Sequence, residues 1–184
     1  MTEISEIVKN KEHQKIFELA KEIGKKMNIP VYLVGGYIRD SFLQKDRVDI
    51  DMMVGNNVFE FSKALSKDLK VNTTVNFEKF QTSRIPYEGC EIEIANARKE
   101  IYDSNSRKPS KVEKASINDD LIRRDFTINT ICMSLNYDNF GELIDPYSGI
   151  KDINKGIIKT PADPDKTFID DPLRMLRAIR FAAQ

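Results

Sequence analysis

The chain of 184 residues contains no tryptophan, one histidine and two cysteines, and each scarcity narrows the chemistry it can carry out. His13 is the single histidine, so histidine-based metal sites and histidine general-base triads are disfavoured, and we expect His13 to face solvent on a charged helix. Cys90 and Cys132 lie far apart in apolar runs, which excludes a disulfide scaffold and indicates a reducing, cytoplasmic compartment. Catalysis would therefore depend on carboxylates, arginines and the backbone.

Net charge and long apolar runs are also absent. Lys plus Arg and Asp plus Glu both number 29, so the chain lacks the basic excess that is typical of a general nucleic-acid binder. A locally basic cleft is still compatible with this composition. No apolar stretch approaches the roughly 20 residues that a membrane span needs, and the N-terminus shows no signal pattern. We therefore expect no membrane partner, and nothing in the sequence indicates an oligomeric state.

The distribution of apolar residues predicts a mixed α/β domain. The expected helices cover residues 4–27, 37–44 and 57–68, and the expected strands cover residues 31–34, 48–54, 71–75, 77–85 and 89–95. Residues 98–118 are polar and lack apolar periodicity, so we expect one long loop there. A last helix begins at Asp171 and continues to Gln184. Because a natural chain rarely stops inside an apolar helix, we expect this chain to be a fragment.

Two glycines, Gly35 and Gly36, directly follow the predicted strand 31–34 and precede a predicted helix. Glycines at such a point let the backbone approach phosphate oxygens closely, and the helix N-terminus supplies free N–H donors and the positive end of the helix dipole. Arg39 lies in the first turn of this helix, where its guanidinium can pair with a phosphate. This segment therefore predicts a phosphate-binding turn.

Asp49 and Asp51 lie two positions apart on the next predicted strand, so their side chains project on the same face. Adjacent carboxylates repel each other unless a cation joins them, and Mg²⁺ prefers such oxygen ligands. A glycine turn beside a carboxylate pair is typical of phosphoryl or nucleotidyl transfer. The alternative is a Gly-Gly hairpin beside a solvated acidic edge strand. Glu93 would be a third catalytic carboxylate beside the pair or, alternatively, an ordinary paired strand glutamate.

Four motifs occur in order along the chain. They are Gly35-Gly36-x-x-Arg39-Asp40 with Asp49-x-Asp51, then Arg123-Arg124-Asp125-Phe126-Thr127-Ile128-Asn129, then Asp145-Pro146-x-x-Gly149-x-x-Asp152, and finally Asp171-x-x-Arg174 continuing to Arg177 and Arg180. Together they resemble the motifs of the class II tRNA nucleotidyltransferase and bacterial poly(A) polymerase family, in the DNA polymerase beta-like superfamily. The resemblance covers roughly residues 30–184.

The resemblance implies a role for each matched position. Asp49 and Asp51 would hold two catalytic Mg²⁺ ions. The nucleotide-binding residues would be Gly35, Gly36, Arg39, Arg124, Asp125, Asp171, Arg174, Arg177 and Arg180. Among these, the first motif would contact the triphosphate, the second would lie by the sugar and phosphates, and Asp171 with Arg174 would read the base edges of CTP and ATP. Arg177 and Arg180 would line the same pocket.

Simpler interpretations exist for the fourth motif. Asp171 followed by proline at the first helical position is a good N-cap pattern, which would give the aspartate a purely structural role. Residues 171, 174, 177 and 180 fall on one broad helical face, since each step is close to the three-residue neighbour relation. The arginines of this face would, in the alternative, simply be solvated.

The fold that the resemblance implies is an α+β, DNA polymerase beta-like head, in which a mixed, mostly antiparallel sheet is flanked by helices. Residues 1–165 would form this catalytic head and residues 166–184 the beginning of a helical neck. The implied activity is the addition of CMP and AMP from CTP and ATP to the 3′ end of tRNA or another RNA, with release of pyrophosphate. Two alternatives are a poly(A) polymerase that uses ATP only and a nucleotide-binding module without turnover.

Overall fold

The computed structural model describes residues 7–45, 49–101 and 111–184, and for residues 98–101 and 111–114 it describes the backbone only. The chain divides into two compact units. Unit 1 is formed by residues 1–96 and 132–144, and unit 2 by residues 97–131 and 145–184. Within the described ranges, no helix is both long and apolar enough to cross a membrane.

Unit 1 contains a seven-stranded sheet with the order β3-β4-β5-β2-β1-β8-β9. Its elements are α2 (Lys11–Met27), β1 (Val31–Val34), α3 (Gly36–Phe42), β2 (Ile50–Val54), α4 (Val58–Asp68), β3 (Val75–Phe77), η1 (Glu78–Phe80), β4 (Thr82–Tyr87), β5 (Cys90–Asn96), β8 (Cys132–Ser134) and β9 (Leu143–Ile144). Strands β2 and β5 run parallel, and the other strand pairs in the described part of the sheet are antiparallel. The predicted mixed, mostly antiparallel sheet with flanking helices is therefore confirmed.

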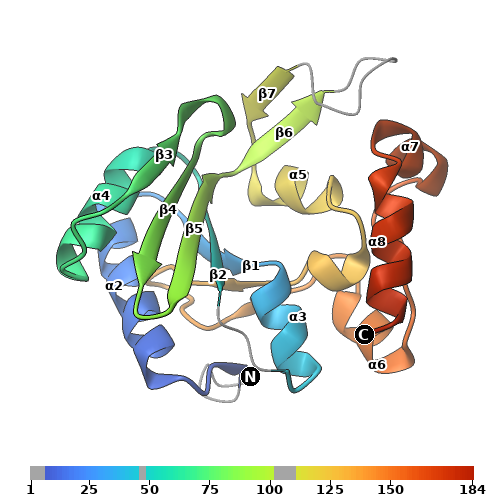
Figure 1. Ribbon diagram of the computed structural model, residues 1–184, viewed down its shortest axis with the longest axis horizontal. Helices are drawn as coiled ribbons and strands as arrows, with labels where there is room; N and C mark the ends of the chain where they lie inside the picture. Colours follow the sequence, from blue (N-terminus) through green and yellow to red (C-terminus); the bar gives the residue numbers. More distant parts are fainter. Residues whose placement is uncertain (1–6, 46–48, 102–110) are drawn as a thin grey trace. The chain divides into compact units, whose positions relative to one another are not determined.

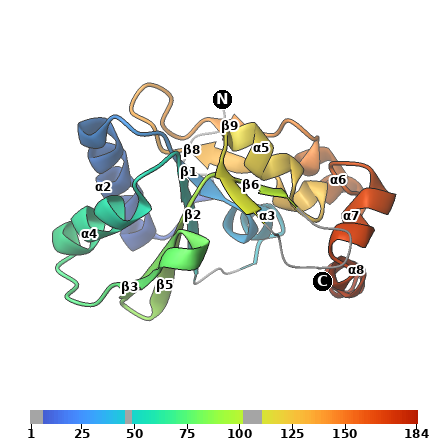
Figure 2. The ribbon, with the colours of Figure 1, turned by 90° about the horizontal axis from the view of Figure 1, so that it is seen from above.

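The two faces of this sheet differ in burial because side chains alternate along each strand. On β5, Ile92 and Ile94 are buried, whereas Glu91 and Glu93 lie on the opposite face and are more exposed. Helix α4 packs against β4 and β5 and also against α2. Figures 1 and 2 show α2 and α4 side by side against the sheet. Glu91 and Glu93 thus lie on the more exposed of the two faces.

Helix α2 buries the one histidine of the chain. His13 is 5% exposed, and its Nδ1 lies 2.8 Å from the Tyr37 hydroxyl. The expectation that His13 faces solvent was wrong, because His13 and Phe17 lie one helical turn apart and both rings contact Tyr37. Burial lowers the pKa of His13 and raises the pKa of Tyr37 to about 12. The pair is therefore a neutral part of the core.

Two expectations for the strands need correction. The strand expected over residues 71–75 begins only at Val75, in β3. The strand expected over residues 77–85 is interrupted by η1, after which Gln81 adopts a left-handed conformation with φ 49° and β4 begins. Apolar content alone does not reveal such a turn, because Gln81 is not a residue type that is typical of left-handed backbone.

Unit 2 is mainly helical. Its elements are β6 (Arg98–Ile101), β7 (Lys111–Lys114), α5 (Ile117–Ile122), η2 (Thr127–Asn129), α6 (Gly149–Lys155), α7 (Pro164–Asp170) and α8 (Leu173–Ala182). The single long loop expected over residues 98–118 is wrong where β6 and β7 pair as antiparallel strands and where α5 begins. Each of these strands holds one aliphatic residue, Ile101 or Val112, which is too few for a periodic signal. Residues 102–110 lie outside the described residues.

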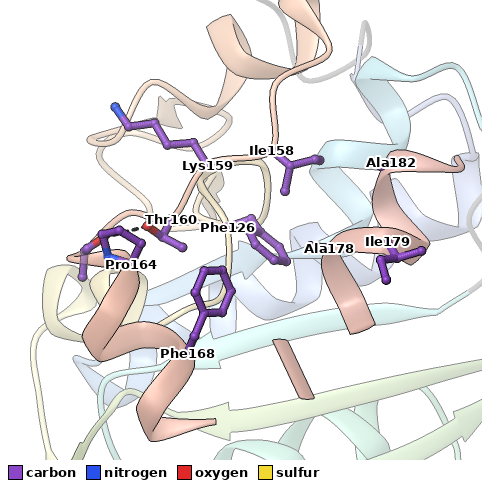
Figure 3. A pocket seen from close by; sticks show the side chains of 10 residues that line it. Phe126, Ile158, Lys159, Thr160, Pro164, Phe168, Ala178, Ile179 and Ala182 are labelled. Atoms are coloured by element: carbon purple, nitrogen blue, oxygen red, sulfur yellow. Dashed lines mark hydrogen bonds between the residues drawn. The ribbon is translucent and has the colours of Figure 1, made fainter. Parts of the chain in front are cut away.

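The core of unit 2 forms around Phe126, Ile128 and Phe181. The rings of Phe126 and Phe181 pack edge to face with their centroids 5.9 Å apart. A pocket of about 600 Å³ opens onto this core, and Figure 3 shows Phe126 and Phe168 among the side chains that line it. Much of the wall of this pocket also belongs to the hydrophobic cluster, so the pocket is an open part of the core. None of the predicted site residues lines it.

Candidate active site

The predicted phosphate-binding turn lies at the edge of the sheet of unit 1. Strands β1 and β2 are antiparallel with Leu33 opposite Met52, so the end of β1 and the beginning of β2 meet at the same edge. Gly35 leaves β1 with φ 70° and ψ −129°, a conformation that is essentially restricted to glycine, and α3 begins at Gly36. The turn and the carboxylates of β2 are therefore neighbours, as the sequence predicts.

The two aspartates are fixed by the start of β2. Asp49 is exposed just before the strand, and its Oδ1 accepts a hydrogen bond of 3.4 Å from the backbone N–H of Glu91 on the neighbouring strand. Asp51 is half-buried within the strand. The two carboxylates thus stand two residues apart at the start of β2.

Glu93 lies directly beside Asp51. In the parallel pairing of β2 and β5, Asp51 is opposite Glu93, and in the antiparallel pairing of β5 and β4, Glu93 is opposite Arg84. The Nε of Arg84 donates to the Oε2 of Glu93 at 2.8 Å. The structure therefore brings Glu93 next to the aspartate strand and also gives it the ordinary ion-pair partner of the alternative interpretation.

The guanidinium of Arg39 is held inside unit 1. Arg39 is 7% exposed, and its Nε and Nη2 contact the Oδ1 of Asp40 at 2.8 and 2.6 Å. Asp40 directly follows Arg39 in the first motif, so the motif supplies the arginine together with a carboxylate that orients it. A phosphate ligand would meet a cation already fixed in position.

The donor set at this edge fits a magnesium ion of the kind that proteins bind through few ligands. Mg²⁺ is usually held by one or two carboxylates together with waters and substrate phosphates. Asp49 and Asp51 offer two carboxylates at the start of β2, beside a turn that suits phosphates. In the described residues, no three side chains of His, Cys, Asp or Glu converge on a point that could hold a metal ion. Asp49 and Asp51 would therefore supply part of a coordination shell.

The second motif is organised around a residue that sequence reasoning missed. Asp120 is almost fully buried, and its Oδ2 accepts from Arg124 Nη2 at 3.0 Å while its Oδ1 accepts from Arg123 Nη2 at 2.5 Å. Burial alone would raise the pKa of Asp120, but the charges and hydrogen bonds of the two arginines outweigh it and hold the pKa below its usual value. The spacing of Asp120 and Arg124, four residues apart at a helix end, was a usable signal.

Asp125 links the second and fourth motifs. Its Oδ1 accepts hydrogen bonds from the backbone N–H of Phe126 at 2.9 Å and from Asn129 Nδ2 at 2.8 Å. Its Oδ2 accepts from Arg177 Nε at 2.6 Å. The structure thus brings together two residues, Asp125 and Arg177, that the resemblance assigns to one nucleotide.

The remaining residues of the fourth motif take different positions. Arg174 is 9% exposed and donates to the carbonyl oxygens of Thr167 at 3.4 Å and Arg123 at 2.9 Å. The Oδ1 of Asp171 accepts from the N–H of Leu173 at 3.1 Å, but the N-cap residue of α8 is Pro172, so the expected N-cap position of Asp171 is off by one residue. Arg180 is exposed, with its guanidinium carbon 4.8 Å from the centroid of the Phe181 ring.

Residues of the third motif pack against and hydrogen-bond to residues of the second motif. A Cβ on Gly149 would lie 2.2 Å from the carbonyl oxygen of Thr127, so only glycine fits this close approach. Asp152 accepts a hydrogen bond of 2.6 Å from the Thr127 hydroxyl, and Asp145 caps α6 by accepting from the N–H of Gly149 at 2.6 Å. The spacing of these residues therefore fixes the backbone on which Asp125 and Asn129 lie.

The predicted residues fall into two sets. Unit 1 carries Gly35, Gly36, Arg39, Asp49, Asp51 and Glu93, and unit 2 carries Arg124, Asp125, Asp171, Arg174, Arg177 and Arg180. The mixed sheet, with a glycine turn beside a carboxylate pair at one edge, is the arrangement that the sequence predicts for a head domain of the nucleotidyltransferase type. The chain belongs to the family described as "Poly A polymerase head domain", which it matches over residues 31–159.

Relatives and solved structures agree with this family. The chain is 40% identical over 153 residues to the A-adding tRNA nucleotidyltransferase of Aquifex aeolicus, covering 83% of this chain and 18% of the relative. It is 36% identical over 171 residues to the CCA-adding enzyme of Bacillus licheniformis, covering 92% of this chain and 41% of the relative. A CCA-adding enzyme from Thermotoga maritima, solved with tRNA, superimposes with a TM-score of 0.81 at 34% identity and covers 98% of this chain and 40% of its own. The chain thus spans well under half the length of these proteins.

Proposed function

We propose that the chain is the catalytic head of an RNA nucleotidyltransferase that adds CMP and AMP from CTP and ATP to the 3′ end of tRNA, releasing pyrophosphate. The observation that carries this proposal is the edge of unit 1, where the Gly35 turn and the carboxylates of Asp49 and Asp51 meet. Solved CCA-adding enzymes in complex with ATP and with CTP, each 37% identical with a TM-score of 0.82, support the choice of nucleotides. Residues 1–165 would be the head and residues 166–184 the beginning of a helical neck.

Unit 1 would bind the metals and the phosphates. Nucleotidyltransferases of this class generally use divalent metal ions, and we assign two Mg²⁺ ions to Asp49 and Asp51. When bound, such ions lower the pKa of an attacking hydroxyl and neutralise charge on the transferred phosphate. The backbone N–H groups at the start of α3 and the fixed guanidinium of Arg39 would hold the triphosphate. Glu93, beside Asp51, would be the third carboxylate.

Unit 2 would bind the sugar and select the base. Arg124, Asp125 and Arg177 would contact the sugar and phosphates. Arg174 supports the selection of the base through its rigidity, since two carbonyl oxygens hold its guanidinium. A fixed donor fork rejects a base whose edge leaves it unpaired, which is how a polar site achieves high selectivity. Asp171 would add the acceptor.

A second candidate is the addition of AMP alone. The relatives from Aquifex aeolicus and Geobacter sulfurreducens, 40% and 35% identical, are both named A-adding tRNA nucleotidyltransferases. The same metal and phosphate residues would serve either reaction. The two candidates therefore differ only in whether CTP is accepted.

The test uses two tRNA transcripts, one that lacks the terminal CCA and one that ends in CC, each incubated with the protein, Mg²⁺ and each NTP alone or CTP with ATP. Sequencing of the products should show CCA on the first transcript and a single A on the second. Addition of A only to the second transcript would establish the A-adding candidate, and long A tails would establish a poly(A) polymerase. Nucleotide binding without any addition would indicate a module without turnover. Asp51→Asn is the control and should remove addition while the chain stays folded.

A further inference from the structure

A charged row crosses three adjacent strands of unit 1. Asp51 on β2, Glu93 on β5 and Arg84 on β4 are successive partners in the strand register. Side chains at partner positions project on the same face of a sheet. Because β5 lies between the other two strands, Glu93 can lean toward Asp51 or toward Arg84, and these directions are opposite.

Several contacts keep Arg84 beside Glu93. Its Nε donates to the Oε2 of Glu93 at 2.8 Å, and its Nη1 lies 3.4 Å from the Oε1 of Glu91. Its guanidinium carbon is 5.3 Å from the centroid of the Phe77 ring on β3. Arg84 thus contacts groups of β5 and β3, and its ion pair holds the Glu93 carboxylate beside β4.

The position of Glu93 bears on how many carboxylates can reach one metal ion. Asp49, Asp51 and Glu93 lie on two neighbouring strands, yet the described residues contain no group of three carboxylates that could share one metal ion. A carboxylate paired with an arginine has one oxygen engaged and its charge compensated, so it attracts a nearby cation less. The ion pair would therefore compete with a bound metal ion for Glu93.

We propose that Arg84 is a positioning residue that withholds Glu93 from the divalent metal bound by Asp49 and Asp51. A metal that recruits Glu93 must first break the Arg84–Glu93 pair, and this cost lowers the affinity of the site. The proposal rests on the metal assignment under Proposed function. It goes further in making the strength of metal binding depend on a residue that lies outside the four motifs.

The test is a titration of the metal-free chain with Mn²⁺, followed by electron paramagnetic resonance of the unbound ion. Arg84→Gln should lower the Kd for Mn²⁺ by about two- to fivefold, the range expected from breaking a partly exposed ion pair. Glu93→Gln in the otherwise unchanged chain should alter the Kd little, because Glu93 is already engaged. The double variant Arg84→Gln, Glu93→Gln should lose the whole gain.

Two controls separate the proposal from other effects. Lys79→Gln removes a charge from the neighbouring η1, where Lys79 lies over Phe80 and not beside Glu93, and should leave the Kd unchanged. A gain in Mn²⁺ affinity that persists in the double variant would mean that Arg84 acts only through its long-range electrostatic field. A higher Kd in Arg84→Gln would mean that Arg84 orients Glu93 toward the metal. Either result overturns the proposal alone. If Asp51→Asn leaves the Kd unchanged, the metal assignment itself fails, and this inference fails with it.

Discussion

Arg177 donates its Nε to the Oδ2 of Asp125 at 2.6 Å, and this bond joins two predicted nucleotide-binding residues that are 52 positions apart. The Asp125 side chain is 7% exposed and that of Arg177 is 45% exposed. The other carboxylate oxygen of Asp125 is used by Phe126 and Asn129. Arg177 thus compensates a buried charge from a helix face that the sequence alone could equally have assigned to solvent.

Replacement of Arg177 by glutamine should therefore destabilise the chain. The buried carboxylate of Asp125 would lose its charged partner, which costs about 1–3 kcal/mol. Urea unfolding followed by circular dichroism measures the change. Arg180→Gln is the matched control, because Arg180 is an exposed arginine one turn further along the same helix whose cation lies over Phe181. It should change the free energy of unfolding by less than about 0.5 kcal/mol; equal losses in both variants would contradict the role given to the Asp125 pair.

The same two variants test nucleotide binding. If Arg177 belongs to the nucleotide site, Arg177→Gln should weaken the binding of ATP by about tenfold, which corresponds to about 1.4 kcal/mol for a charged contact. Isothermal titration calorimetry at a temperature where both variants are folded measures the affinity. An unchanged Kd in a folded variant would confine Arg177 to a structural role.

Gly35 should tolerate no other residue. Its backbone, with φ 70° and ψ −129°, lies in a region that is essentially restricted to glycine, so Gly35→Ala should cost about 1–3 kcal/mol. Gly35→Asn should be no better, since asparagine relieves strain only in the left-handed helical region. Gly156 supplies the contrast, because its φ of 63° and ψ of 35° lie in that region and Gly156→Asn should be nearly neutral. Thermal unfolding of the three variants tests this, and a neutral Gly35→Asn would contradict it.

The glycine turn and the aspartate pair of unit 1 could be predicted from the sequence because their signals are local. The apolar run of β1, the glycines after it and the alternation of Asp49 and Asp51 with apolar residues all lie within about 20 residues and need no knowledge of pairing. Arg84 carried no such signal, since its importance comes from the strand register that places it opposite Glu93.

In the fourth motif, the sequence could not predict the surroundings of each arginine. Helical spacing places Arg174, Arg177 and Arg180 on one broad face, but it does not show which of them is buried. The structure buries Arg174 against two carbonyl oxygens, pairs Arg177 with Asp125 and leaves Arg180 exposed. These differences depend on tertiary contacts with segments about 50 residues away.

Asp120 should make the chain sensitive to acid. Its pKa lies below the ordinary value of 3.8, so the ionised carboxylate contributes stability that is fully present above that value and is lost as the pH falls through the lower, folded-state pKa. Asp120→Asn keeps an acceptor oxygen but removes the negative charge beside Arg123 and Arg124, which should cost about 1–3 kcal/mol near neutral pH.

Urea unfolding between pH 3 and pH 7 measures both effects of Asp120→Asn. The variant should lose less stability on acidification than the unchanged chain. Asp165→Asn, at an exposed position in the first turn of α7, is the control and should follow the unchanged chain. A parallel pH dependence in Asp120→Asn would show that other carboxylates cause the acid sensitivity.

His13 should control stability at a higher pH. Burial lowers its pKa below 6.5 in the folded chain, so the unfolded chain binds the proton more readily. The stability that neutral His13 contributes is therefore complete above pH 6.5 and declines as the pH falls below it. His13→Gln, which can still hydrogen-bond the Tyr37 hydroxyl but does not titrate, should flatten this decline between pH 6.5 and pH 5.5. Tyr37→Phe should instead cost about 1 kcal/mol and keep the decline. Because His13 is the only histidine, an unflattened curve in His13→Gln would show that burial of its ring is not the cause.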